Sequence, residues 1–230
     1  MQSSNYKIES DSVNVGGVRS SSGSYIMEDT MGEVGTGLSS SANYILKAGY
    51  QQMQGSYLSL SAPIDITMTP LSLSQNTAVG SAGWTVITDN GAGYTLSINA
   101  SSTSPCPLNA GGVRNALCNM STSNAFTDLA TTSKATWSVS SAYKFGYSAF
   151  GNDTTGHGTD ADCIAGTDVP SATLLWQGFD GTKLIEIASS TSRTSPSGTV
   201  STLCVAVEQN GVFAPSGTYQ ATTTATLIAL

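Results

Sequence analysis

Three copies of one short phrase, spaced 19 residues apart, open this 230-residue chain. Each copy has a pair of serines, then a tyrosine, and two residues further an apolar side chain; these pairs are Tyr6 and Ile8, Tyr25 and Met27, and Tyr44 and Leu46. A unit this short cannot bury its own apolar side chains, so it needs a partner surface, either on the rest of the chain or on a neighbouring molecule. The sequence therefore predicts a repeat segment, residues 1–54, ahead of a domain of residues 55–230.

The composition limits the class of protein. Only 10% of the residues are charged, a low share that is typical of secreted surface proteins and unlike a cytoplasmic enzyme. Acidic side chains outnumber basic ones by 15 to 8, and the net charge of -7 argues against binding to nucleic acid or anionic lipid. No apolar run reaches the length that spans a membrane.

The cysteines indicate an oxidising compartment. They are even in number, and none forms a C-x-x-C pair of the kind found in zinc and redox sites: Cys106, Cys118, Cys163 and Cys204. We therefore expect two disulfides and an extracellular or cell-surface location. Three pairings are open at this stage; if the close pair Cys106 and Cys118 closes one loop, Cys163 is left to bond with Cys204.

The hydrophobic pattern alternates along most of the chain, which predicts strands. Residues 84–88 and 94–100, on either side of the turn residues 89–93, predict a hairpin, and residues 135–139 with 143–147 predict a second one. Further strands are expected at 57–60, 64–68, 184–187, 202–207 and 218–230. This spacing predicts an all-β fold, an antiparallel sandwich of the immunoglobulin-like or pilin-like kind, with the repeat segment as an extension in which Gly-rich stretches around Gly16 and Gly35 reverse the chain.

A resemblance supports this architecture. Residues 3–53, with their Ser-Ser-x-x-Tyr phrases, the run Met27–Glu33 and the closing run Leu46–Met53, resemble the N-terminal segment of predicted secreted surface and filament proteins of uncultivated bacteria. Residues 84–98, together with 214–219, are similar to the β domain that follows this segment there. The resemblance implies a location and an architecture, and it carries no catalytic residues.

Candidates for chemistry are few, and we predict that the chain is not an enzyme. The single histidine, His157, is not accompanied by the G-x-S-x-G motif of a serine hydrolase, and the carboxylates form no obvious pair for glycoside hydrolysis. No cofactor is expected, although the loop around His157 holds three possible ligands of a structural calcium ion: Asp153, Asp160 and Asp162. The three tryptophans could stack on sugars, but core packing is the expected role: Trp84, Trp137 and Trp176.

The sequence favours a structural subunit of an extracellular filament or surface layer. In this hypothesis an extended piece of the repeat segment of one copy adds to the sandwich of the next copy, and the six repeat side chains Tyr6, Ile8, Tyr25, Met27, Tyr44 and Leu46 anchor it. The chief alternative is that the repeats fold back as small hairpins in a monomeric surface module. Such a module would be an adhesin, or would bind a surface glycan or protein through loops that include residues 151–168.

Overall fold

The computed structural model describes Gly17 and residues 19–28, 37–40, 45–48, 57–100, 106–108, 112–158, 162–166, 168–179, 181 and 183–230. The chain divides into two compact units, Met1–Ser56 and Tyr57–Leu230. Regular structure in the described ranges is entirely β, and the same ranges contain no helix long and apolar enough to cross a membrane.

The first unit contains two hairpins that repeat each other. Strand β1 (Arg19–Ser21) pairs with β2 (Ile26–Glu28), and β3 (Gly37–Ser40) pairs with β4 (Ile45–Ala48). Ser20 faces Met27 in the first hairpin and Ser39 faces Leu46 in the second, so the two registers agree after a shift of 19 residues. The sequence repeat is thus also a repeat of backbone pairing.

The turn of the first hairpin lies in the serine-rich phrase itself. Ser22 N–H donates to the Tyr25 carbonyl over 2.7 Å, and the Ser22 hydroxyl accepts from Tyr25 N–H over 3.2 Å. This local side-chain bond is the reason that serine suits the position. The Gly-rich reversals expected around Gly16 and Gly35 fall outside the described residues.

The second unit is built on a five-stranded sheet in the order β10-β11-β15-β6-β5. Its strands are β5 (Leu58–Leu60), β6 (Thr77–Thr88), β10 (Thr127–Asp128), β11 (Ala142–Gly151) and β15 (Thr199–Asn210). All pairs are antiparallel except β10 with β11. The central strand β15 is buried on both faces, which explains its unbroken apolar run Leu203–Val207.

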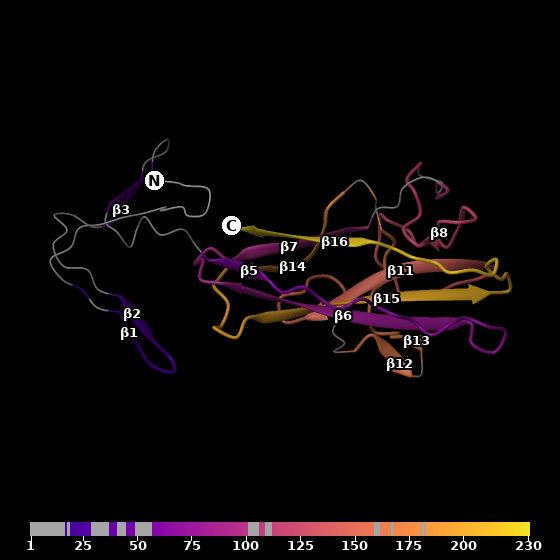
Figure 1. The fold of residues 1–230 in the computed structure, drawn as a ribbon, viewed down its shortest axis with the longest axis horizontal. Helices are drawn as coiled ribbons and strands as arrows, with labels where there is room; N and C mark the ends of the chain where they lie inside the picture. The colour runs from indigo at the N-terminus through magenta and orange to yellow at the C-terminus, as the bar shows by residue number, and fades with distance from the viewer. Residues whose placement is uncertain are drawn as a thin grey trace. The chain divides into compact units, whose positions relative to one another are not determined.

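A three-stranded sheet in the order β14-β7-β16 forms the second layer. Its strands are β7 (Tyr94–Ala100), β14 (Ile185–Ser190) and β16 (Thr223–Ala229). Figure 1 shows β7 and β16 lying over β15 and β6. The side chains between the layers form one core, among them Trp84, Leu96, Phe145 and Leu203. Two short pairs complete the unit: β8 (Cys118–Asn119) with β9 (Asn124–Ala125), and β12 (Ile164–Gly166) with β13 (Val169–Pro170).

The fold confirms the all-β sandwich but corrects both predicted hairpins. The turn after β6 leads into the other sheet, because β6 pairs with β15 and β5 whereas β7 pairs with β14 and β16. Tyr94, Leu96 and Ile98 therefore face Trp84 and Val86 across the core instead of lying beside them. Residues 135–139 contribute only a bridge from Ala135 to Trp176, since β11 takes β15 as its antiparallel partner.

Candidate functional site

A groove of about 420 Å³ opens along one side of the sandwich. One wall is formed by residues 63–68 and the other by residues 219–223, which lead into β16. Its floor is made of core side chains: Ala82, Trp84, Leu117, Phe145, Leu203 and Val205. The volume lies within the roughly 300–1,000 Å³ typical of ligand sites, so the groove can hold several side chains.

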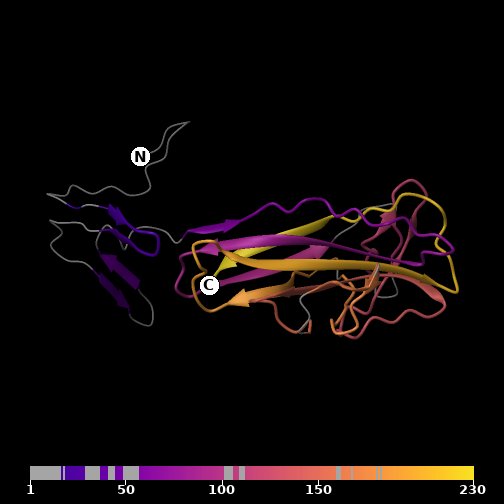
Figure 2. The same cartoon turned by 90° about the horizontal axis from the view of Figure 1, so that it is seen from below.

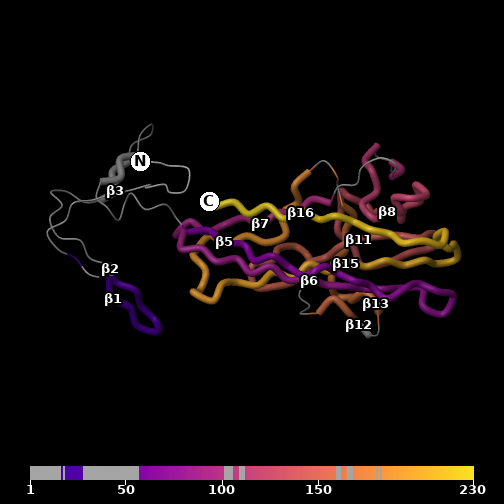
Figure 3. The backbone as a smooth tube through the Cα atoms, viewed as in Figure 1, coloured from indigo at the N-terminus to yellow at the C-terminus, as the bar shows by residue number. Residues whose placement is uncertain are grey.

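The first wall was predicted as a strand and is not one. Residues 62–71 run beside β6, as Figures 2 and 3 show, but make no backbone hydrogen bond to the described part of the chain. Pro63 and Pro70 flank the segment and have no N–H to donate to a ladder. Ile64, on the rim of the groove, is 83% exposed, whereas Ile66 and Met68 pack against the core.

A glycine lets this wall approach β6. A Cβ atom added to Gly80 would lie 2.3 Å from Ile66 Cγ2, so the Ile66 side chain fills the place of a side chain on the sheet. Ala78, Gly80 and Ala82 point to the core side of β6 in turn, and all three are small. Their small size makes room for Ile66 at one position and for the groove at the next.

The second wall is held by the hairpin of β8 and β9. Gln220 and Cys118 exchange two backbone hydrogen bonds of 2.9 and 3.0 Å. The Tyr219 ring packs edge-on against Phe126 at a centroid distance of 5.0 Å, and its hydroxyl donates to the Pro215 carbonyl over 2.7 Å. The wall is therefore placed by contacts with a hairpin that lies about a hundred residues earlier in the chain.

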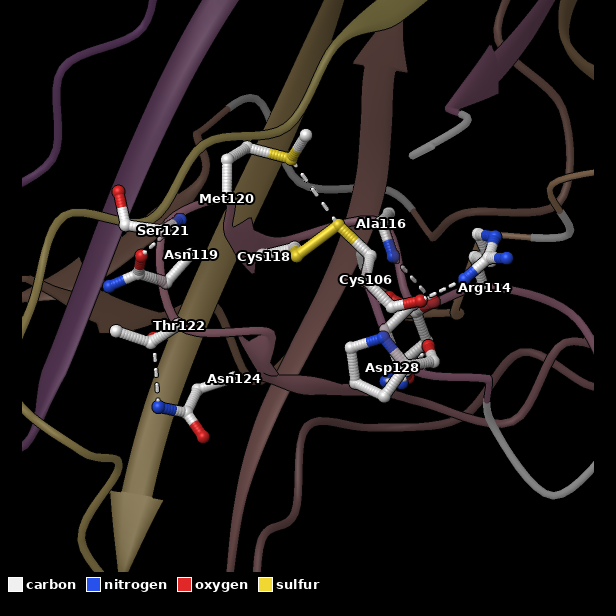
Figure 4. Close-up of a disulfide and its surroundings, with 12 residues drawn as sticks. Cys106, Arg114, Ala116, Cys118, Asn119, Met120, Ser121, Thr122, Asn124 and Asp128 are labelled. Atoms are coloured by element: carbon white, nitrogen blue, oxygen red, sulfur yellow. Dashed lines mark hydrogen bonds between the residues drawn. A yellow bond between two sulfur atoms is a disulfide. The ribbon is translucent and has the colours of Figure 1, made fainter. Parts of the chain in front are cut away.

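The disulfide Cys106–Cys118 ties an earlier segment of the chain to the first residue of that hairpin (Figure 4). Arg114 donates a side-chain hydrogen bond to the Cys106 carbonyl, and the Met120 sulfur lies 3.5 Å from the Cys106 sulfur. Both cysteines are fully buried. Since Cys118 also bonds to Gln220, this disulfide is connected directly to the second wall of the groove.

Asp128 forms hydrogen bonds with the residues that precede β8. Its carboxylate accepts the Ala116 N–H over 3.0 Å, and its own N–H donates to the Asn115 side chain over 3.1 Å. Burial is the main cause that raises the pKa of Asp128 to about 7, while the Ala116 hydrogen bond and the charge of Lys144 act in the opposite direction. Asp128 thus changes charge near neutral pH.

The other disulfide, Cys163–Cys204, lies on the opposite face of the five-stranded sheet. Cys204 points away from the main core and packs in a second cluster with Val79, Leu174 and Trp176. Trp137 packs edge-on against Trp176 at 5.1 Å, and its ring N–H donates to Glu208 over 2.5 Å. Trp84 belongs to the main core, so all three tryptophans serve packing, as the sequence predicted.

His157 is sealed in the interior. Its Nδ1 lies 3.5 Å from the Ser148 hydroxyl, but that hydroxyl donates to the Leu175 carbonyl over 2.8 Å, and both residues are buried. Burial lowers the pKa of His157 to about 4, so the ring is neutral at physiological pH. The histidine therefore acts as a packing residue here, and the lack of enzymatic activity stays a prediction.

The proposed calcium loop is described only in part. Asp153 accepts a hydrogen bond of 2.7 Å from the Tyr94 hydroxyl, and the Asp162 carboxylate accepts the Ile164 N–H over 3.3 Å. Asp160 lies outside the described residues. No group of three potential metal ligands is assembled within the described ranges, and calcium stays a prediction.

The predicted anchors of the repeat segment are partly described. Tyr25 is 79% exposed and Met27 is 65% exposed, and Ile26 between them is 63% exposed. Leu46 lies in β4 opposite Ser39. The remaining anchors, Tyr6, Ile8 and Tyr44, lie outside the described residues.

The role of these residues as anchors stays a prediction, and the groove was not predicted from the sequence. The one local signal for it is the row of small residues Ala78, Gly80 and Ala82, which leaves space on an otherwise bulky core face. Comparison with protein-family models, with curated proteins and with solved structures finds no match.

Proposed function

We propose that this protein is a structural subunit of an extracellular filament or surface layer whose copies join by strand addition. The observation that carries the proposal is the first repeat hairpin, which presents Tyr25, Ile26 and Met27 to solvent in one uninterrupted apolar run. Large apolar side chains that are exposed side by side mark interaction surfaces. The same hairpin register recurs 19 residues later, so the segment offers equivalent attachment strands in series.

Strand addition suits the geometry of these hairpins. Their strands are only three or four residues long, and an isolated two-stranded hairpin is marginally stable in water. Pairing with the edge of another sheet would stabilise such a strand through main-chain hydrogen bonds, with alternate side chains setting the register. A contact between a repeat segment and the sandwich of the next copy is head-to-tail, so it propagates as a fibre.

The extracellular location is part of this proposal. Two disulfides, both buried, support it because such bonds persist in oxidising compartments. The low content of charged residues and the resemblance of residues 3–53 to segments of secreted surface proteins agree with it.

The proposal is tested on the full chain by replacing repeat tyrosines. We expect the wild type to form polymers in negative-stain micrographs and in size-exclusion chromatography. The double variant Tyr25→Asp with Tyr44→Asp should lose them with an unchanged melting temperature, because it places charges where apolar anchors are needed. Leu184→Asp is the matched control, since Leu184 is 54% exposed and precedes β14, outside the repeats.

Two outcomes would contradict the proposal. A wild type that stays monomeric at all concentrations would favour the surface module, and that module would keep its ligand affinity without assembling. Normal polymers from the double tyrosine variant would show that these anchors do not carry assembly.

A further inference from the structure

We infer that the groove between residues 63–68 and 219–223 is the acceptor for the repeat hairpin of a second copy of this chain. This inference rests on the proposed function and names the surface at which assembly takes place. The occupant is β2, which holds Ile26 and Met27, together with Tyr25 just before it, or the counterpart of this segment one repeat later.

The floor of the groove matches what the hairpin presents. In an extended strand, alternate side chains point to the same side, so Tyr25 and Met27 point one way and Ile26 the other. The floor consists of apolar core residues, including Trp84, Phe145 and Leu203, which a strand lying in the groove would cover. Two large apolar side chains in alternate positions are what such a floor can bury.

The sides of the groove have backbone groups available for pairing. In the second wall the backbone of Gln220 is already bonded to Cys118, but Thr223 begins β16, which pairs with β7 along one edge and has no ladder partner on the other within the described ranges. The opposite wall, residues 62–71, makes no backbone hydrogen bond to the described part of the chain. Because β2 pairs with β1 along one edge, its free edge can pair with one of the two walls. An unpaired sheet edge is otherwise a site of uncontrolled association.

Charged residues near the groove bear on the direction of entry rather than on affinity. Among the described residues that line the groove, Asp65 is the one that is charged. The two described hairpins each contain one basic residue, Arg19 in β1 and Lys47 in β4, and β2 also contains the acidic Glu28 opposite Arg19. A basic side chain that meets Asp65 would fix the direction in which the hairpin enters more than it would add to affinity.

The number of donors favours a second copy over the same chain. The groove is a single site of about 420 Å³, whereas the chain carries three copies of the tyrosine phrase. A chain that filled its own groove would still present further copies of the phrase to its neighbours. Occupation by the chain's own hairpin is therefore an outcome that the test must separate.

The test is photo-crosslinking between isotopically distinct copies. The full chain carrying p-benzoylphenylalanine in place of Tyr25 is made in unlabelled form, mixed with ¹⁵N-labelled wild type, allowed to assemble and irradiated. We expect crosslinks from the unlabelled to the labelled chain at residues 63–68, 82–84 or 219–223. The same photoreactive residue at Leu184 is the control, and it should not reach these positions.

A groove-filling variant gives a second readout. Ala82 lines the floor, so Ala82→Leu should reduce the groove crosslinks at least tenfold under conditions in which urea unfolding shows the variant to be folded. Ala92→Leu, in the exposed turn between β6 and β7, is the matched control.

The outcomes separate this inference from the proposed function. Crosslinks between copies that lie elsewhere on the sandwich would overturn the groove assignment and leave strand addition standing. Crosslinks only within one chain would overturn the inference in favour of self-occupation. Polymers that never form would remove the proposed function together with the inference.

Discussion

The two disulfides should separate stability from assembly. Replacing Cys163 and Cys204 by alanine opens a link between residues 41 apart, and replacing Cys106 and Cys118 opens one between residues 12 apart. In the loop-entropy account these separations correspond to about 4 and about 3 kcal/mol of unfolding free energy at 25 °C. Both pairs are buried, so the cavities left by the sulfur atoms add a similar cost to each variant.

The effect on assembly should follow the opposite order: losing Cys106–Cys118 should reduce assembly more than losing Cys163–Cys204. Cys118 bonds through its backbone to Gln220 in the second wall of the groove, whereas Cys163–Cys204 lies on the opposite face of the five-stranded sheet. Loss of the Cys106–Cys118 disulfide should therefore loosen the second wall of the groove and abolish polymers. Loss of the larger loop should leave assembly near the wild-type level at temperatures where the protein stays folded.

Urea unfolding followed by tryptophan fluorescence measures the unfolding free energy of each variant, and filament counts in negative-stain micrographs measure its assembly. Equal slopes of unfolding free energy against urea would show that the variants share one native fold. The reasoning is refuted if filament loss follows stability, so that the Cys163→Ala, Cys204→Ala variant assembles less well than the Cys106→Ala, Cys118→Ala variant.

Two further predictions concern the wall and the core. Gly80→Ala should destabilise the sandwich by about 1–3 kcal/mol in urea unfolding, because its new Cβ would meet Ile66 at 2.3 Å. Gly83→Ala, whose Cβ would find ordinary contacts of 3.4 Å and beyond, should be neutral or slightly stabilising. An equal loss in both variants would refute the packing of Ile66 against Gly80. Because the folded pKa of Asp128 is raised to about 7 from 3.8, its contribution to stability falls as the pH rises between these values. Asp128→Asn should therefore gain stability relative to wild type as the pH rises over that range, by about 1.4 kcal/mol for each pH unit between the two pKa values. His157, whose lowered pKa gives the opposite slope, is present in both proteins, so its contribution cancels. A difference in unfolding free energy that does not change with pH would contradict the raised pKa of Asp128.

The sequence was sufficient for the fold class because alternation is a local property. Strands β14, β15 and β16 lie where the alternating apolar residues place them, and the two cysteine pairs lie in one sandwich unit. The hairpin after β6 was wrong because a turn inside one sheet and a turn between two sheets have the same local pattern. What decides between them is the pairing of β6 with β15, more than a hundred residues away.

The groove could not be predicted for the same reason. Its two walls are about 150 residues apart in the chain, and the disulfide hairpin that places the second wall is a third distant segment. A single sequence contains the small residues Gly80 and Ala82 but not the fact that Ile66 covers one of them and leaves the other open.

The wrong strand at residues 64–68 is itself informative. Its alternation is that of a strand, and Ile66 and Met68 do point to the core, yet no ladder forms because the wall meets β6 through side chains. A segment with strand alternation and unpaired backbone groups costs free energy unless water or another strand satisfies those groups. The repeat hairpins have the opposite deficiency, since their backbones are paired but the described Tyr25, Ile26 and Met27 side chains are not covered. Joining the two remedies both deficiencies at once, and this is the physical reason for placing the hairpin of one copy in the groove of the next.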